Sequence, residues 1–277
     1  MTDPGSTDFV PVTDRIAVFD NDGTLWNEKP LYIPLEYEIS YIKELVKRKP
    51  EFKENVLFRE LAAGNLAILK DYDSFDLIHA LFAAHDGQHE EDYNESVYNF
   101  LTYAKHPRFE RPYKEMVYQP MVGLVDYLQA NEFNVFIVTG GEISFARTVS
   151  EEIYNIPAEN VIGSSIQFRY VSDSSGAYII RTGKIISAND KHIKPANIEL
   201  HIGKKPIFAA GNSDGDYEMM EYTLSGEGPS MAILVHHDDE EREYNYMKGT
   251  EKAVQDAETK GWHVVSMKND FRIIFPE

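Results

Sequence analysis

Short hydrophobic runs recur along the chain, and residues that favour turns follow each of them. The runs lie at 16–19, 134–138, 206–210, 231–235 and 263–265. Stretches with helical periodicity, at 120–133 and 215–224, separate some of these runs; the first places Met121, Leu124, Val125 and Leu128 on one face. Short apolar strands that alternate with amphipathic helices are typical of a parallel sheet buried on both faces. We therefore predict an α/β fold with a Rossmann-like parallel sheet as its core.

This alternation breaks after the first strand, because no convincing strand run occurs between about residues 30 and 118. Two groups of apolar residues in this segment each share a helical face: Ile39, Ile42, Leu45 and Val46, and Leu77, Ala80, Leu81 and Ala84. We predict that residues 1–29 and 119–277 form the core and that residues 30–118 form an inserted helical cap. Residues 164–186 alternate around a Ser/Gly turn and predict a β-hairpin within the core.

Charge and composition exclude several classes of protein. The chain has 277 residues, 27 Lys and Arg against 46 Asp and Glu, and a formal net charge of −19. A nucleic-acid partner is not expected, because such surfaces need clustered basic residues. The absence of Cys excludes disulfides and thiolate metal sites. No apolar run reaches membrane-spanning length and the N-terminus lacks signal-peptide features, so we expect no membrane partner and favour a cytoplasmic location. Export followed by removal of a signal is the alternative.

Polar residues of a consistent kind follow three of the predicted strands. These are Asp20-Asn21-Asp22-Gly23-Thr24 after the first strand, Thr139-Gly140-Gly141 after the second, and Asn212, Asp214 and Asp216 after the third; Lys191 and Lys194 lie between the last two groups. The carboxyl ends of parallel strands meet at one edge of a sheet, so these groups are expected to converge. Carboxylate and amide oxygens suit Mg²⁺, whereas a hydroxyl, glycine backbone and a lysine suit phosphate.

Each of these segments also has a simpler interpretation when taken alone. The first is compatible with a plain turn, the third with an Asx-rich or calcium-binding loop, and a lone lysine with a surface charge. Their common order and their positions just after apolar strands favour a single site for phosphoryl chemistry.

The motifs together resemble those of the haloacid dehalogenase superfamily of aspartyl-nucleophile phosphohydrolases. The resemblance covers residues 16–220: Asp20, Asp22 and Thr24 match Asp-x-Asp-x-Thr, Thr139 matches the second motif, Lys194 (with Lys191 as fallback) the third, and "GNSDGD" the fourth. The long helical insert and "VTGG" resemble the phosphoserine phosphatase-like branch, which has a helical cap at this position. "FDNDGTLW", "GNSDGD" and the segment from His236 to Tyr244 further resemble a bacterial group of uncharacterised phosphatases.

The resemblance implies a Mg²⁺-dependent phosphomonoester hydrolase that acts on a small phosphorylated metabolite. Asp20 would be the nucleophile and Asp22 the general acid and base, with a pKa above that of a free Asp, while Thr139 and Lys194 would bind the transferring phosphoryl group. The metal ligands would be Asp20, Asp22 through its backbone carbonyl, Asn212 and Asp216. Phosphate and substrate contacts are expected from Asn21, Gly23, Gly140, Gly141, Trp26 and Glu28.

The fourth motif departs from the family pattern in one residue. Relatives usually carry a metal-binding Asp directly after the glycine, where this chain has Asn212, so Asp214 is a further candidate ligand. A phosphotransferase or mutase that uses the same aspartate, or a non-catalytic phosphate-binding module, is the alternative function.

Three further groups of residues are expected to have mainly structural roles. His236 and His237 should emerge at the functional edge, and Asp238 or Asp239 is expected to cap a helix that begins with "EEREYNYM". The basic residues of 105–113 are expected to pair with acidic neighbours. The cap histidines His79, His85 and His89 are expected to be surface or packing residues.

Overall fold

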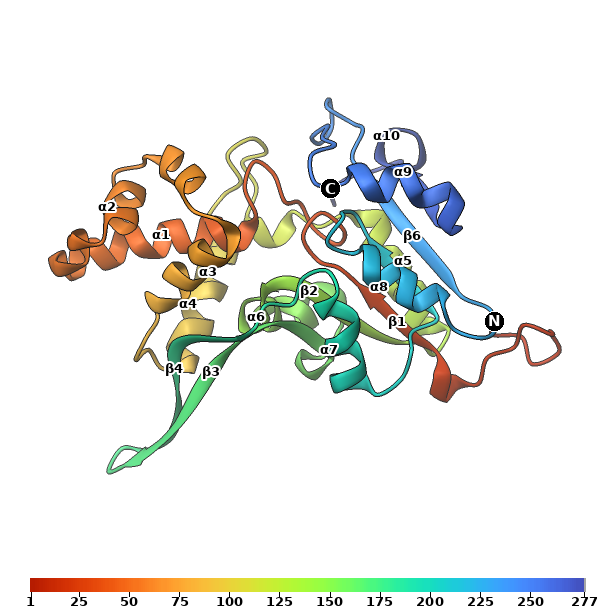
Figure 1. Cartoon of the computed structure of the whole chain (residues 1–277), viewed down its shortest axis with the longest axis horizontal. Helices are drawn as coiled ribbons and strands as arrows, with labels where there is room; N and C mark the ends of the chain where they lie inside the picture. Colours follow the sequence, from red (N-terminus) through yellow and green to blue (C-terminus); the bar gives the residue numbers. More distant parts are fainter. Residues whose placement is uncertain (277) are drawn as a thin grey trace.

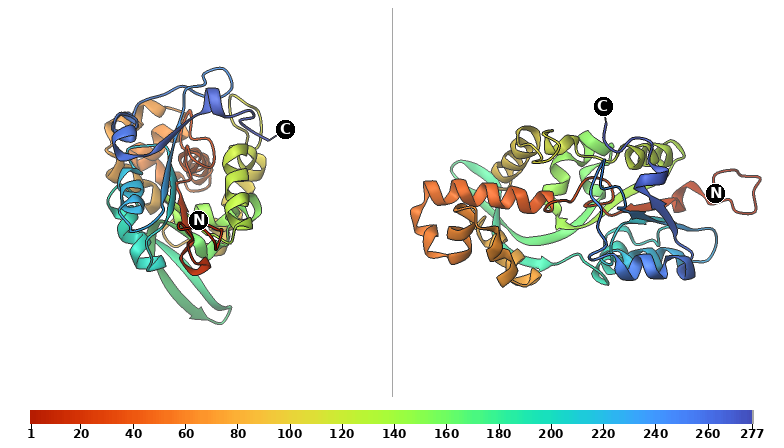
Figure 2. Two further views of the ribbon diagram at one scale, coloured as in Figure 1. Left: turned by 90° about the vertical axis from the view of Figure 1, so that its right-hand side faces the viewer. Right: turned by 90° about the horizontal axis from the view of Figure 1, so that it is seen from above.

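The computed structural model describes residues 1–276, in which a seven-stranded sheet carries helices on both faces (Figures 1 and 2). The strands lie in the order β4-β3-β2-β1-β5-β6-β7, and every neighbouring pair is parallel except β3 and β4. Their bounds are β1 Ile16–Phe19, β2 Asn134–Glu142, β3 Val161–Asp173, β4 Gly176–Ser187, β5 Phe208–Gly211, β6 Met231–His236 and β7 His263–Ser266. The α/β fold predicted from the apolar runs is confirmed.

The helices of the core follow the strands as the alternation predicted. They are α5 Gln119–Ala130, α6 Ile143–Tyr154, α7 Ile193–Ile202, α8 Tyr217–Leu224, α9 Glu251–Lys260 and the short α10 Met267–Asp270. Short 3₁₀ helices occupy Val12–Asp14, Pro50–Glu54, Leu66–Asp71, Tyr113–Glu115 and Ala158–Asn160. None of the helices within residues 1–276 is long and apolar enough to cross a membrane.

Strand β1 lies at the centre of the sheet, between β2 and β5. All four of its residues are buried; Ala17 and Phe19 belong to the hydrophobic core on one face, and Ile16 and Val18 to the core on the other. A strand buried on both faces needs apolar residues at every position, which explains the unbroken run. The residues that follow β1 therefore emerge at the middle of the carboxyl edge of the sheet.

The segment after β1 is helical, as predicted. It contains α1 Ile33–Arg48, α2 Val56–Ala62, α3 Ser74–Ala83 and α4 Glu90–Tyr103, which lie on the left in Figure 1. Most of α1, with α2 and α3, packs around a separate hydrophobic core, whereas α4 packs on the core of the sheet. Both predicted apolar faces contribute to the separate core: Ile39, Ile42, Leu45, Val46, Leu81 and Ala84 are buried in it, and Leu77 and Ala80 pack against it. The domain boundaries at residues 30 and 118 stay predictions.

The predicted hairpin is formed by β3 and β4, and it joins the edge of the sheet to the helical segment. Backbone hydrogen bonds run from Arg181 N to Gln88 O (2.9 Å) and from Gly87 N to Arg181 O (3.0 Å). The Arg181 guanidinium is fully buried and lies 2.7 Å from Glu90 and 3.4 Å from Glu142. The hairpin is therefore a second connection between the sheet and the cap helices.

The helix predicted to begin at "EEREYNYM" is wrong, because the chain from 237 to 250 forms an irregular loop. The Glu243 carboxylate is fully buried and accepts hydrogen bonds from Tyr118, from Asn27 and from the backbone N–H of Tyr244. Arg108 donates to the backbone carbonyls of Glu240, Glu241 and Glu243. These tertiary contacts take up groups that a local helix would need, and Asp239 instead binds Arg242.

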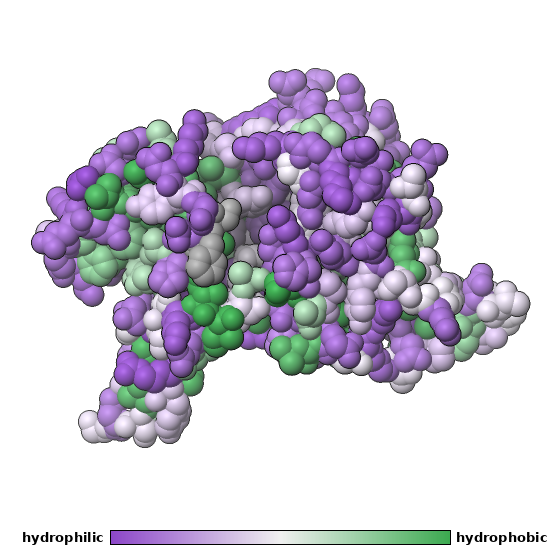
Figure 3. Space-filling model, viewed as in Figure 1, coloured by the Kyte–Doolittle hydropathy of each residue, from purple (hydrophilic) through white to green (hydrophobic). Residues whose placement is uncertain are grey.

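Most of the face drawn in Figure 3 is hydrophilic, in keeping with the charge of the chain.

Candidate active site

Asp20 and Lys194 meet at the carboxyl end of β1, as the parallel topology predicted. The Asp20 N–H continues the sheet by donating to the carbonyl of Ala210 (2.9 Å). Lys194, in the first turn of α7, places Nζ 2.6 Å from Asp20 Oδ1, 2.6 Å from Asp216 Oδ1 and 2.8 Å from the carbonyl of Val138. All three charged side chains are buried. Lys191, the fallback for the third motif, is exposed, so the geometry favours Lys194.

The protonation of this cluster depends on burial and on its own charges. Burial and the nearby charge of Asp216 raise the pKa of Asp20 well above its ordinary value, although Lys194 acts in the opposite direction. Burial lowers the pKa of Lys194, but the charges of Asp20 and Asp216 outweigh it and raise that pKa. When both carboxyls are ionised, two negative charges face the single ammonium of Lys194, and a bound cation would offset the excess.

Asp22 lies beside Asp20 with its carboxyl held at both oxygens. The indole N–H of Trp26 donates to Oδ1 (2.9 Å), and the hydroxyl of Thr139 donates to Oδ2 (3.5 Å). Burial raises the pKa of Asp22 to about 7, although the Trp26 hydrogen bond acts against the shift. A carboxyl with this pKa holds a proton over part of the neutral range, as a general acid requires.

Trp26 was expected to contact the substrate. Its side chain is instead fully buried. Its indole N–H is taken by Asp22, and its ring packs edge-on against Phe145 with centroids 6.1 Å apart. In this position the side chain orients the Asp22 carboxyl rather than contacting a substrate.

The residues predicted to hold phosphate fall into two groups. Gly140 and Gly141 lie at the end of β2 beside Thr139, where the N–H of Gly141 donates to the Thr139 hydroxyl (2.9 Å). Asn21 is buried and its Oδ1 has no hydrogen-bond partner among the described residues; within its side-chain amide only Nδ2 can donate to phosphate. The N–H of Gly23 already donates to the carbonyl of Trp26 (2.8 Å), so it is not free to bind phosphate.

The acidic loop after β5 separates Asp214 from the site. Asp214 accepts hydrogen bonds from the N–H groups of Ala253 (2.7 Å) and Lys252 (3.4 Å) at the start of α9. It therefore stabilises a helix N-terminus, and this geometry favours Asn212 over Asp214 as the candidate metal ligand. Asp216 Oδ2 accepts from the backbone N–H of Asn212 and from both the N–H and the hydroxyl of Ser213, at 3.0–3.1 Å. With Lys194 at Oδ1, the Asp216 carboxylate organises this loop.

One oxygen of Asp20 and the amide oxygen of Asn212 both lie near the hydroxyl of Thr24. Thr24 Oγ lies 3.4 Å from Asp20 Oδ2 and 3.4 Å from Asn212 Oδ1, and all three side chains are buried. No three His, Cys, Asp or Glu side chains gather as a metal site within the described part of the chain. A carboxylate and an amide oxygen beside uncompensated negative charge nevertheless fit Mg²⁺, which commonly takes one or two protein carboxylates and completes its shell with water and phosphate.

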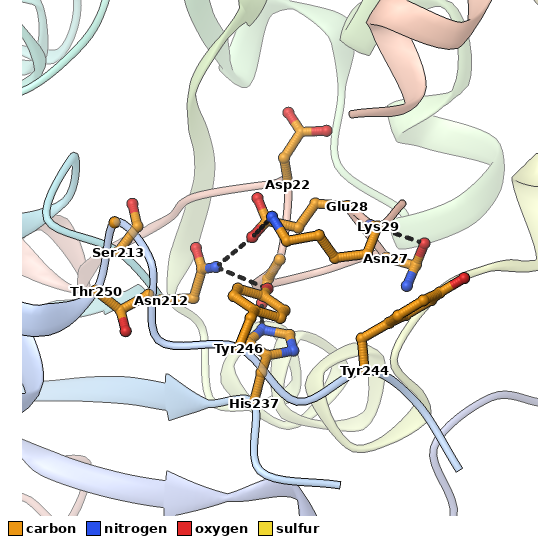
Figure 4. A network of polar contacts seen from close by, with 12 residues as sticks. Asp22, Asn27, Glu28, Lys29, Asn212, Ser213, His237, Tyr244, Tyr246 and Thr250 are labelled. Atoms are coloured by element: carbon orange, nitrogen blue, oxygen red, sulfur yellow. Dashed lines mark hydrogen bonds and ion pairs between the residues drawn. The ribbon is translucent and has the colours of Figure 1, made fainter. Parts of the chain in front are cut away.

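One wall of the site comes from the 237–250 loop, for which the sequence predicted a capped helix (Figure 4). His237 Nε2 donates to the carbonyl of Gly23 (2.7 Å), its Nδ1 lies 3.2 Å from Glu243, and its ring stacks on Tyr246. The Lys29 ammonium lies 4.2 Å from the centroid of the Tyr246 ring and 3.2 Å from Glu28. The position of His237 just after β6 is the signal that placed it near this edge.

The three cap histidines are surface or packing residues, as expected, and His79 is exposed. His85 is buried against Glu38, with 2.9 Å between Nε2 and Oε2, and His89 stacks on Tyr178. Arg108 of the basic segment binds backbone carbonyls and not the predicted acidic side chains, whereas Arg111 lies 3.4 Å from Glu115.

Comparisons with known proteins agree with this arrangement. The sequence model of the haloacid dehalogenase-like hydrolases matches residues 17–221. No curated protein sequence matches the chain. A protein of unknown function from Bordetella pertussis Tohama I is 14% identical with a TM-score of 0.57, covering 91% of this chain and 98% of that one. A functionally unknown protein from Anaerococcus prevotii DSM 20548 is also 14% identical, with a TM-score of 0.60 and coverage of 94% and 87%.

These two likenesses show a shared fold. A phosphoserine phosphohydrolase-like protein from Francisella tularensis is 18% identical over 91% of this chain and 94% of that one, with a TM-score of 0.47. The family match spans β1, the cap helices and the acidic loop, which are the segments that build the site. The chain belongs to the haloacid dehalogenase-like hydrolases.

Proposed function

We propose that this protein hydrolyses phosphomonoesters of small metabolites through an aspartyl-phosphate on Asp20, with Mg²⁺ as its cofactor. The observation that carries the proposal is the pair of neighbouring carboxyls in different environments. Asp20 is held against a buried lysine at 2.6 Å, whereas the pKa of Asp22 is raised to about 7. Lys194 favours the ionised form of Asp20, which a nucleophile needs, and burial favours the protonated form of Asp22, which a general acid needs.

In the first step a carboxylate oxygen of Asp20 attacks phosphorus, and the bond between phosphorus and the leaving oxygen breaks. Asp22 gives its proton to the leaving oxygen, so that an alcohol departs. Thr139 and the Gly140-Gly141 backbone lie beside Asp22 at the end of β2, where they would bind the phosphoryl oxygens. Lys194 stays on Asp20 Oδ1 and offsets charge on the nucleophile.

In the second step the Asp22 carboxylate takes a proton from water, and the resulting hydroxide attacks phosphorus. The bond between phosphorus and Asp20 breaks, and inorganic phosphate leaves. Mg²⁺, when bound, would supply positive charge that offsets the repulsion between Asp20 and the phosphate. Asp20 and Asn212 would hold it, together with the Asp22 carbonyl that the family resemblance adds, while Asp216 fixes the loop beside them.

The presence of an acid separates this reaction from cleavage of a carbon–halogen bond. A halide is a good leaving group and needs no proton, whereas an alkoxide does. The hydrogen bonds from Trp26 and Thr139 fix the orientation of the Asp22 carboxyl, while burial keeps its pKa high enough for it to hold a proton.

The test is phosphate release from p-nitrophenyl phosphate and from a panel of phosphoserine, sugar phosphates and nucleotides, with Mg²⁺ and with EDTA. We expect Mg²⁺-dependent turnover in the wild-type protein and none in Asp20→Asn, whose circular dichroism spectrum should be unchanged. Retained turnover in Asp20→Asn would refute the nucleophile. Transfer of phosphate to added alcohols or sugars in preference to water would instead indicate a phosphotransferase.

A further inference from the structure

The amide of Asn212 faces two different environments at its two ends. Its Nδ2 lies 3.3 Å from Glu28 Oε1 and 3.5 Å from the hydroxyl of Tyr246, and its Oδ1 lies 3.4 Å from the hydroxyl of Thr24 (Figure 4). Asn212 and Glu28 are both almost completely buried. The nitrogen end therefore points away from Asp20, and the oxygen end points toward it.

Glu28 determines this orientation, because an ionised carboxylate can only accept hydrogen bonds. A reversed amide would place its oxygen against Glu28 and turn its NH₂ group toward Thr24 and Asp20. Burial makes such an unpaired contact between two acceptors costly.

The Asn212 amide also packs against Gly23. A Cβ at position 23 would lie 2.1 Å from Asn212 Nδ2 and 2.9 Å from the carboxyl carbon of Glu28, so both side chains rest directly on this residue. Gly23 has a φ of 81°, which favours glycine, and His237 holds its carbonyl at 2.7 Å. The amide is thus enclosed by Gly23, Glu28 and Tyr246.

We propose that Glu28 is a positioning residue that turns the carbonyl oxygen of Asn212 toward the Mg²⁺ site, and that it is the reason why this chain carries Asn at position 212. The inference rests on the proposed function, because that function supplies the metal. An Asp at 212 would bring a second carboxylate to about 3.3 Å from Glu28 in a buried site, where like charges repel strongly. The resemblance places a negative charge on the residue at position 212, whereas in this chain the carboxylate belongs to Glu28, which contacts Asn212.

The first experiment needs neither metal nor activity. Thermal unfolding is measured in EDTA for the wild type, Glu28→Gln, Asn212→Asp and the double variant. Glu28→Gln should lower Tm or leave it unchanged in the wild-type background, because a hydrogen bond to a charged group becomes a neutral one. In the Asn212→Asp background the same change should raise Tm by several degrees, because the Gln amide can donate to the new carboxylate.

We therefore expect Glu28→Gln to raise Tm in the Asn212→Asp background but not in the wild-type background. An equal effect of Glu28→Gln in both backgrounds would overturn the proposal, because it would show that positions 28 and 212 do not interact.

The second experiment stays informative if Asn212→Asp does not fold. Mg²⁺ alone is titrated into wild type, Glu28→Ala and Asp214→Asn by calorimetry. Glu28→Ala frees the amide to rotate and should weaken Mg²⁺ binding at least tenfold, a loss typical of residues that orient metal ligands. Asp214→Asn is the control, because it removes a charge from the same loop on the side that faces α9. The affinity of this variant for Mg²⁺ should stay within twofold of the wild-type affinity.

Wild-type affinity in Glu28→Ala would overturn the proposal. If no phosphomonoester is hydrolysed, the proposed function fails while the reversal in EDTA still stands. If phosphate is released but Glu28→Ala binds Mg²⁺ normally, the positioning role alone fails.

Discussion

Replacing Lys194 with Met removes the positive charge between two buried carboxylates and retains most of the apolar stem. Lys194 contacts Asp20 and Asp216 at 2.6 Å each, and its side chain is 2% exposed. Because the stem still fills its space, the loss of stability comes mainly from the charge and the hydrogen bonds.

The magnitude follows from what the two carboxylates retain. Asp216 keeps three donors from Asn212 and Ser213, whereas Asp20 keeps a 3.4 Å contact with Thr24. Asp20 is therefore the group left without compensation. Removing one partner of a buried ion pair costs about 3–5 kcal/mol, so Lys194→Met should lower the free energy of unfolding by about this amount.

The assay is urea unfolding in EDTA at pH 7.5, followed by the fluorescence of Trp26 and Trp262. The double variant Lys194→Met/Asp20→Asn removes the uncompensated charge and should recover about half of the loss. A loss below about 1 kcal/mol for Lys194→Met, or no recovery in the double variant, would refute the assignment of an uncompensated charge to Asp20.

Three further outcomes are expected. Asp214→Asn should lower the free energy of unfolding by about 1 kcal/mol, because it weakens the cap of α9 at Ala253, and phosphate release should be unchanged. The pKa of Asp22 in the folded protein, about 7, lies above the ordinary 3.8. Ionised Asp22 therefore lowers the stability of the folded state above pH 7, and this loss of stability declines as the pH falls and Asp22 takes up a proton. The metal-free protein should therefore gain about 1 kcal/mol between pH 8 and pH 6 in urea titrations, and Asp22→Asn should remove this gain. Arg181→Met should speed hydrogen exchange at the Gly87 amide, which donates to the carbonyl of residue 181, because the buried charge of Glu142 loses its partner; unchanged exchange would contradict the role of the hairpin.

The sequence predicted the layout of the site because that layout follows from periodicity and topology. An unbroken apolar run fixes β1 at the centre of the sheet, and parallel strands bring Asp20, Thr139 and Asp216 to one edge. Lys194 was chosen over Lys191 by resemblance, and α7 places it inward because Lys194 and Ile198 are one helical turn apart and both are buried.

Contacts between distant segments could not be predicted in this way. The acidic run after His237 has helical propensity, but Glu243 takes donors from Tyr118 and Asn27, which lie more than a hundred residues away in sequence. Asp214 and Asp216 are the same residue type in one loop, two positions apart. Only the position of α9 shows that Asp214 faces a helix end.

In the first motif, some residues fold the turn and others are available for chemistry. The hydrogen bonds that their polar groups already make distinguish the two kinds. The Asn21 carbonyl accepts three backbone N–H groups, the Gly23 N–H binds the Trp26 carbonyl, and the Trp26 indole binds Asp22. These interactions fold the turn and leave little capacity for a ligand. Asp20 is different, because burial and like charge keep its carboxyl in need of a cation even with Lys194 in place. Asp20 is thus the residue of this motif whose negative charge most needs a further cation, and we expect the chemistry to start from it.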